Sequence, residues 1–190
     1  MMQYLPSIAG VAILSILITR MLIPLSYVFG LLDQPSDRKT HTGSIPLIGG
    51  ISIYLSVVIG SVVFLDLNET FIGISIICGL VTLMGVMDDR YPLQPIYRLL
   101  VQLIAGTAIA SIGVKVSSLG NLLGLGEFQL SVLAIPFTAI AITGLCNAYN
   151  MVDGIDGLTG SLTLVTMASL LYLAMGRAPD NELALLAFFC

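Results

Sequence analysis

The residues best suited to chemistry lie in one short stretch, residues 147–160, which reads NAYNMVDGIDGLTG. Two asparagines and two aspartates recur there at every third position, namely Asn147, Asn150, Asp153 and Asp156. In a helical or near-helical backbone, side chains at this spacing lie close to one line and form a row of oxygen ligands. The interspersed glycines weaken a continuous helix and let a ligand come close. The stretch therefore predicts a broken helix end that carries a substrate or ion site.

A pair of adjacent acids, Asp88 and Asp89, directly follows another apolar run. Two neighbouring carboxylates repel each other and are costly to desolvate, so they need compensation, part of which Arg90 and Arg98 can supply. Mg²⁺ is commonly held by a few carboxylates together with substrate phosphate oxygens. The pair thus predicts a divalent-cation or phosphate site. The alternative is a helix-terminal charge pair that lies among the lipid headgroups.

A third polar segment, residues 32–50, reads LDQPSDRKTHTGSIPLIGG. Its basic pair, Arg38 and Lys39, together with the nearby His41, suits a phosphate group or an anionic lipid headgroup. The alternative is that the basic pair only fixes the topology of the first span. On that interpretation His41 is an ordinary loop histidine.

The composition indicates what kind of protein must position these segments. Of its 190 residues 57% are hydrophobic and 9% are charged, and the mean hydropathy is +1.02, which an ordinary soluble domain does not sustain. The net charge of -4 and the lack of basic clusters argue against a nucleic-acid partner. Cys78, Cys146 and Cys190 all lie in apolar runs without metal-ligand spacing, so we expect small buried hydrophobic side chains.

Six segments are long and apolar enough for transmembrane helices, which need about 17–25 residues each. They cover residues 4–24, 46–65, 71–87, 96–114, 130–146 and 158–175. We therefore expect an all-α, polytopic transmembrane helix bundle with six full spans, in a single integral membrane domain over residues 1–190. The start of a seventh span near Leu183 is too short to cross the bilayer, which predicts the N-terminal part of a longer protein, or a truncated product.

Alternation of the spans places the first, third and fifth loops, residues 33–44, 88–95 and 147–157, on one side of the membrane. Five basic residues lie on that side and two on the other: Arg20, Arg38, Lys39, Arg90 and Arg98 against Lys115 and Arg177. This asymmetry predicts that the three loops are cytoplasmic. No basic residue precedes the first apolar run, so we expect a retained first span rather than a signal peptide. The fourth loop, residues 115–129, fits a small extracytoplasmic hairpin or a plain loop equally well.

In this order, DRKTHTGSIPLIGG, MDDR and NAYNMVDGIDGL resemble the motifs of the polyprenyl-phosphate N-acetylhexosamine-1-phosphate transferase family, glycosyltransferase family 4. The likeness covers residues 32–158, and it is closer to the bacterial undecaprenyl-phosphate N-acetylglucosamine-1-phosphate transferases than to the phospho-N-acetylmuramoyl-pentapeptide transferases. It implies a multi-pass enzyme of the bacterial inner membrane with a cytoplasmic active site. Members of the family carry, further along, another magnesium-binding aspartate and a histidine-rich loop, which this sequence does not contain.

The resemblance also implies a reaction and a set of site residues. N-acetylglucosamine-1-phosphate would pass from UDP-N-acetylglucosamine to undecaprenyl phosphate with release of UMP, as the first membrane step of cell-envelope polysaccharide synthesis, including lipopolysaccharide. Mg²⁺, or Mn²⁺ in its place, would be the cofactor. The implied catalytic residues are Asp88, Asp89, Asp153 and Asp156, the metal ligands Asp88, Asp89, Asn150 and Asp156, and the substrate-binding residues Asp33, Arg38, Lys39, His41, Asn147 and Asn150.

The expected partners are the UDP-sugar, the polyprenyl phosphate lipid and the membrane, and a homodimer is left open. Three other functions remain open at this point. The chain could be a phospho-N-acetylmuramoyl-pentapeptide transferase of the same family, or an inactive truncated membrane fragment. It could also be a cation-coupled transporter, although a transporter's acids are expected nearer the middle of a span.

Overall fold

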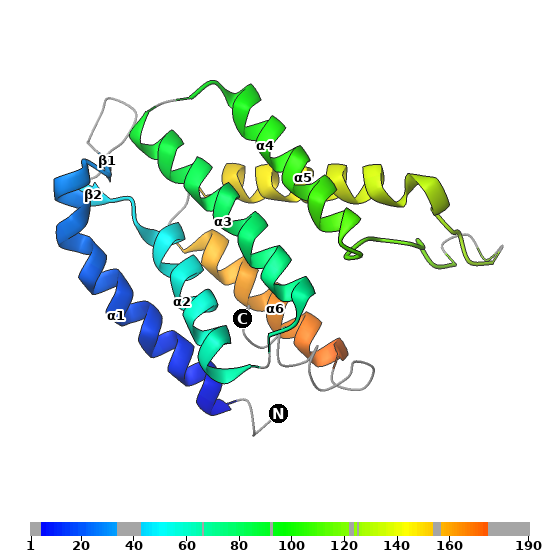
Figure 1. Ribbon diagram of the computed structural model, residues 1–190, viewed down its shortest axis with the longest axis horizontal. Coiled ribbons are helices and arrows are strands. Elements are labelled where there is room, and N and C mark those ends of the chain that lie inside the picture. The colour runs from blue at the N-terminus through cyan, green and yellow to red at the C-terminus, as the bar shows by residue number, and fades with distance from the viewer. Residues whose placement is uncertain are drawn as a thin grey trace. The chain divides into compact units, whose positions relative to one another are not determined.

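The computed structural model describes residues 5–33, 43–65, 67–91, 93–121, 124, 126–153 and 157–174. These residues form six α-helices: α1 (Leu5–Phe29), α2 (Gly49–Phe64), α3 (Glu69–Arg90), α4 (Pro95–Ser111), α5 (Ala134–Val152) and α6 (Leu158–Ala174) (Figure 1). The chain divides into two compact units. The first comprises Met1–Leu67, Val86–Tyr91 and Ile155–Cys190, and the second comprises Asn68–Gly85 and Pro92–Gly154.

Within the described part of the chain, three helical segments are long and apolar enough to cross a membrane, namely Pro6–Phe29, Glu69–Arg90 and Ser131–Val152. The last includes a 3₁₀ turn, η2 (Ser131–Leu133), directly before α5. The helices α2, α4 and α6 are apolar but shorter. Because a straight crossing takes about 20 residues, a bundle of six full spans stays a prediction. The expected start of a seventh span lies outside the described residues.

The first helix is longer than predicted, because Pro24 does not end it. Proline lacks a backbone N–H, but the residues after it keep theirs and can continue the helix. Beyond Pro24, the Ser26 hydroxyl also donates to the Ile23 carbonyl over 2.7 Å. The helix ends instead at Gly30, whose φ of 64° lies in the left-handed region that favours glycine. The N–H of Leu31 then donates to the Ser26 carbonyl over 2.9 Å, which is a Schellman C-cap.

In the first unit, α1 and α2 pack side by side through small residues (Figure 1). Four serines on these helices are almost fully buried: Ser26, Ser52, Ser56 and Ser61. Their hydroxyls donate to carbonyls of their own helices, as Ser61 does to Val57 over 2.7 Å, so each of these four hydroxyls has an acceptor despite its burial. The helix pair therefore holds the two ends of the first loop at a fixed separation.

A two-stranded antiparallel ribbon closes the base of the first loop. Its strands are β1 (Leu32–Asp33) and β2 (Ile45–Pro46), with Asp33 opposite Ile45. The N–H of Leu47 extends the ladder by donating to the Leu31 carbonyl over 2.9 Å. The sequence predicted that the second span begins at Pro46, which is wrong, because the ribbon takes up that residue and α2 begins at Gly49.

In the second unit, α4 and α5 pack closely in antiparallel directions (Figure 1). A Cβ built on Gly106 would lie 3.0 Å from the Cα and 3.1 Å from the carbonyl oxygen of Ala139. Small side chains surround this point and are also buried, namely Ala105, Ala110, Ala134 and Ala139. Small residues let helix backbones approach in a membrane, so this seam fixes α5 against α4.

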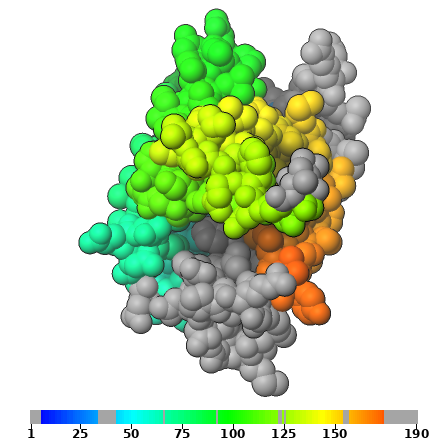
Figure 2. Space-filling model, turned by 90° about the vertical axis from the view of Figure 1, so that its right-hand side faces the viewer, coloured from blue at the N-terminus to red at the C-terminus, as the bar shows by residue number. Residues whose placement is uncertain are grey.

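The fourth loop is a hairpin, so the structure decides between the two predicted alternatives. Ser118 and Gln129 form an antiparallel bridge. The N–H of Leu119 donates to the Phe128 carbonyl over 2.9 Å, and the N–H of Phe128 donates to the Gly120 carbonyl over 3.0 Å. Figure 2 shows the hairpin in yellow-green on the surface that faces the viewer. Its first strand is anchored to α5, because the N–H of Val116 donates to the buried hydroxyl of Thr138 over 2.9 Å.

Candidate functional site

The acid pair lies inside α3 rather than after it. The predicted span ended at Met87, but α3 continues to Arg90, so Asp88 and Asp89 occupy its last turn. Asp88 is half-buried and Asp89 is exposed. Neighbouring residues on an α-helix point about 100° apart, so the two side chains leave the helix on adjacent sides. The helix dipole makes negative charge unfavourable at a helix C-terminus. The positive charge of the adjacent Arg90 offsets this effect.

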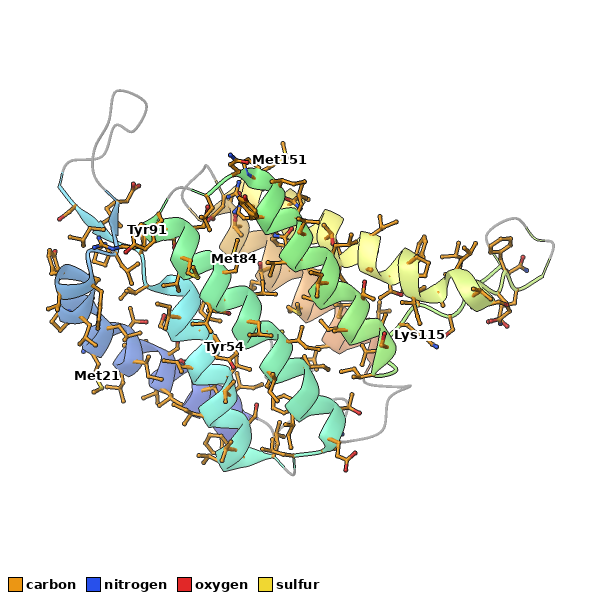
Figure 3. The ribbon with its side chains drawn as sticks, turned by 45° about the horizontal axis from the view of Figure 1, so that its top comes forward. Met21, Tyr54, Met84, Tyr91, Lys115 and Met151 are labelled. Carbon is orange, nitrogen blue, oxygen red and sulfur yellow. The ribbon has the colours of Figure 1, made fainter. Side chains whose placement is uncertain are left out.

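Arg90 joins this acidic turn to the end of α1. Its Nη1 donates a hydrogen bond to the carbonyl oxygen of Gly30 over 3.1 Å, although the two residues are 60 positions apart. The guanidinium also lies over the ring of Tyr91, with Cζ 5.6 Å from the ring centroid, a cation–π arrangement. Figure 3 shows Tyr91 at the end of α3, beside the strands β1 and β2. Sequence reasoning assigned Arg90 only to topology and charge compensation.

The hydrogen bond brings the first and third loops together within the first unit. Gly30 directly precedes Leu31 and β1, and Asp33 ends β1 at the base of the first loop. The acids of the third loop and the start of the first loop therefore share one end of this unit. This is the convergence that alternating spans predict for these two loops.

The predicted break in the 147–160 stretch is confirmed, but it comes later than expected. α5 includes Asn147 and Asn150, which were predicted to lie in a loop, and it ends at Val152. Asp153 is the C-cap residue, and its N–H donates to the Tyr149 carbonyl over 3.1 Å. After the break, Gly157 has a φ of 77° and α6 begins at Leu158.

The described polar residues of this stretch differ in their surroundings. Asn147 is half-buried, and its Nδ2 donates to Oε1 of Gln102 on α4 and to the Thr143 carbonyl, each over 2.8 Å. Asn150 and Asp153 are exposed at the end of α5. They are therefore accessible to a ligand, whereas the amide N–H groups of Asn147 are already occupied. The sequence analysis did not single out Gln102. Its position as a polar residue within an apolar helix could have indicated that it has a polar partner.

Four of the predicted site residues lie outside the described part of the chain: Arg38, Lys39, His41 and Asp156. The described ones fall in two sets, Asp33, Asp88 and Asp89 in the first unit and Asn147, Asn150 and Asp153 in the second.

The donor chemistry of the acid pair suits magnesium. Among the described residues, no three of His, Cys, Asp or Glu come together as a metal site. Mg²⁺ binds hard oxygen atoms and commonly takes only one or two carboxylates, leaving its other positions to water and substrate phosphates. Asp88 and Asp89 provide such oxygens at a helix end, so they fit an ion shared with a phosphate substrate.

Comparison with known proteins gives consistent matches. The model of glycosyl transferase family 4 matches residues 71–190. A probable undecaprenyl-phosphate N-acetylglucosaminyl 1-phosphate transferase of Bacillus subtilis (strain 168) is 30% identical over 173 residues, 90% of this chain and 47% of that protein. The undecaprenyl-phosphate alpha-N-acetylglucosaminyl 1-phosphate transferases of Yersinia pestis and Escherichia coli (strain K12) are 37% and 36% identical, over 74% of this chain and 39% of each relative. The chain thus spans less than half the length of these curated relatives. No solved structure matches the chain.

Proposed function

Because the chain belongs to glycosyl transferase family 4, we propose that this protein transfers N-acetylglucosamine-1-phosphate from UDP-N-acetylglucosamine to undecaprenyl phosphate. The names of the matched relatives support this lipid acceptor and this sugar phosphate. The structural observation that carries the proposal is the hydrogen bond between Arg90 and Gly30, which holds the acid pair beside the base of the first loop. Two motifs of the transferase pattern thereby meet at one end of the first unit.

The proposed step exchanges one phosphate ester oxygen for another. A phosphate oxygen of the lipid attacks the sugar-side phosphorus of the nucleotide, a new P–O bond forms, and the bond to UMP breaks with its electron pair leaving on UMP. A phosphate monoester has its second pKa near about 6, so at neutral pH the attacking lipid is mostly dianionic. A strong general base is therefore unnecessary, and the main barrier is the repulsion between two anions.

The residues of the chain are proposed to divide this work. Asp88 and Asp89 would hold Mg²⁺, or Mn²⁺, whose charge offsets that of the two phosphate groups. Asn150 and Asp153 are exposed at the end of α5, where they can orient the nucleotide sugar. By resemblance, Asp156 would join the metal ligands. Asp33 at the end of β1 would act with the first loop, to which the resemblance assigns phosphate contacts from Arg38, Lys39 and His41.

The proposed setting is the bacterial inner membrane, with the first, third and fifth loops in the cytoplasm. The apolar helices and the membrane lipid named for the relatives support a membrane location. The excess of basic residues on the odd-numbered loops supports the orientation. In this orientation the acid pair faces the compartment that supplies nucleotide sugars.

A transfer assay tests the proposal. Membranes from cells expressing the protein would be given UDP-N-acetylglucosamine labelled in the sugar, undecaprenyl phosphate and Mg²⁺, and labelled lipid and UMP would be measured. We expect Asp89→Asn to lower transfer by about 100-fold or more, and removal of divalent cations by EDTA to have a comparable effect. The control is Glu127→Gln, which changes an exposed acid on the hairpin.

Full UMP release by purified Asp89→Asn protein would refute the assigned role of the acid pair. Transfer only from UDP-N-acetylmuramoyl-pentapeptide would instead identify the other branch of the family.

A further inference from the structure

One side-chain hydrogen bond between α4 and α5 joins Asn147, the first residue of the NAYNMVDGIDGL motif, to Gln102, which lies outside the family motifs. Nδ2 of Asn147 donates to Oε1 of Gln102 over 2.8 Å and also to the carbonyl of Thr143 over 2.8 Å. An asparagine amide nitrogen carries two N–H donors, so both are used within the protein. Asn147 was predicted to bind substrate, yet its donors already serve the contact between two helices.

The neighbouring contacts show that this bond belongs to a rigid seam. Gly106 touches the backbone of Ala139 one turn further along α4, and Val116 bonds to Thr138 beyond that. The Gln102–Asn147 bond lies nearer the end of α5 than either of these two contacts. No backbone hydrogen bond to α4 could do the same work, since helix backbones satisfy their own donors.

The position of Asn147 gives the bond a consequence beyond packing. Asn150 follows it by three residues and Asp153 by six, so all three lie within the last two turns of α5. Helix ends fray unless they are held, and the last carbonyls have no partner within the helix. A tie at Asn147 therefore fixes the rotation of the turn from which Asn150 and Asp153 project.

We propose that Gln102 is a positioning residue for the transfer reaction, and that Asn147 acts as its partner rather than as a substrate ligand. This inference rests on the proposed function. The pair orients the end of α5, so that the carboxamide of Asn150 and the carboxylate of Asp153 meet the nucleotide sugar in one geometry. Loss of the pair leaves these ligands present but misaligned, which affects the rate of transfer more than the binding of substrate.

An exchange of the two amides tests the pairing. Gln102→Asn shortens one side chain and opens a gap between the partners, and Asn147→Gln lengthens the other side chain and crowds them. The double variant restores the combined length. In the transfer assay we expect each single variant to lower kcat by about tenfold or more with a smaller change in KM, and the double variant to recover much of the loss. Thr107→Val is the matched control on α4, because its hydroxyl bonds only to Leu103 of the same helix.

A second pair of variants covers the case in which the exchange does not fold. Gln102→Leu removes the acceptor, whereas Gln102→Glu keeps an oxygen that can accept from Asn147. We expect the leucine variant to lose more activity than the glutamate variant, while both remain folded and unfold in one cooperative thermal transition.

The outcomes separate this inference from the proposed function. Wild-type kcat in Gln102→Leu, or a double exchange no more active than its weaker parent, would overturn the positioning role. A wild-type protein without any transfer would overturn the proposed function and the positioning role with it. The contact itself is then judged by thermal unfolding of the wild type, the two single exchange variants and the double variant, where strictly additive shifts would reject the pairing.

Discussion

Gly30 and Arg90 fit each other in shape as well as through their hydrogen bond. A Cβ built on Gly30 would lie 2.9 Å from Cζ of Arg90, so the space beside this glycine is filled by the guanidinium. Gly30 also has a φ of 64°, a backbone conformation that costs free energy in residues with a Cβ. A side chain at residue 30 would therefore displace the guanidinium of Arg90 from its present place.

Replacing either residue should separate the third loop from the first. Gly30→Ala combines left-handed strain with displacement of the guanidinium, and we expect it to lower the free energy of unfolding by about 1–2 kcal/mol. Arg90→Ala leaves the backbone of Gly30 unstrained, so its effect on stability should be smaller. Both variants should lower transfer by about 10- to 100-fold, because the acid pair loses its fixed position. Thermal unfolding in detergent and the transfer assay measure the two effects.

The double variant provides the check. If Gly30→Ala acts by displacing Arg90, combining it with Arg90→Ala should lower transfer little beyond the worse single variant. Independent, multiplicative losses would show that the two residues act separately.

The sequence predicted much of this arrangement, but it did not predict the hydrogen bonds that connect its parts. The alternation of spans predicted that the loops bearing Asp33 and Asp88 share one side, and the first unit brings their ends together. The bond that does so is made to a backbone carbonyl, and every residue has one. Nothing in the pattern around Gly30 could single it out. The partner of Gln102 could not be predicted either. A polar residue in an apolar helix indicates that it has a hydrogen-bond partner, but the sequence does not show which residue that is.

The glycines of α4 and α5 should respond in opposite ways to alanine. Gly106→Ala places a methyl group against the backbone of Ala139, which cannot move aside as a side chain could. We expect a loss of about 1–3 kcal/mol in the free energy of unfolding. A Cβ on Gly144 meets no atom within 4 Å, so Gly144→Ala should be neutral or stabilise α5 by up to about 1 kcal/mol. Thermal unfolding of both variants measures this contrast, and equal shifts would contradict the close seam.

The hairpin should depend on one hydroxyl. Thr138→Val leaves the N–H of Val116 without its acceptor, which costs about 1–3 kcal/mol. Thr138→Ser keeps the hydroxyl and should retain most of the stability. Hydrogen exchange at the amide of Val116 should rise in the valine variant alone. Unchanged exchange there would show that the contact does not anchor the hairpin.

The boundaries of the helices were the least predictable part of the fold. The acid pair was expected to end the third span at Met87 and Asn147 to end the fifth at Cys146, yet α3 continues for three more residues and α5 for six. Backbone hydrogen bonds favour continuation until a residue prevents it. A polar side chain near the membrane surface does not have to end a helix, since it can project from the helix into water. Among the described residues, Gly30 after α1 and Gly113 after α4 have positive φ and mark such ends more clearly.

The orientation of α4 is the most demanding test of the membrane arrangement. This helix, Pro95–Ser111, extends about 26 Å at about 1.5 Å per residue, slightly less than the hydrocarbon thickness of about 30 Å. It must nevertheless cross if the third and fourth loops lie on opposite sides. In a variant whose native cysteines are replaced, single cysteines at Ser44, Tyr91 and Met151 should react with a membrane-impermeant maleimide only from the cytoplasmic side. All three positions are exposed.

A cysteine at Glu127, at the tip of the hairpin, should react only from the opposite side. Labelling of the Tyr91 and Glu127 positions from the same side would show that α4 does not cross. Labelling of the Tyr91 and Met151 positions from opposite sides would be more serious. It would separate the acid pair from Asn150 and Asp153 by the full membrane, and a single phosphate-binding site could not then contain both.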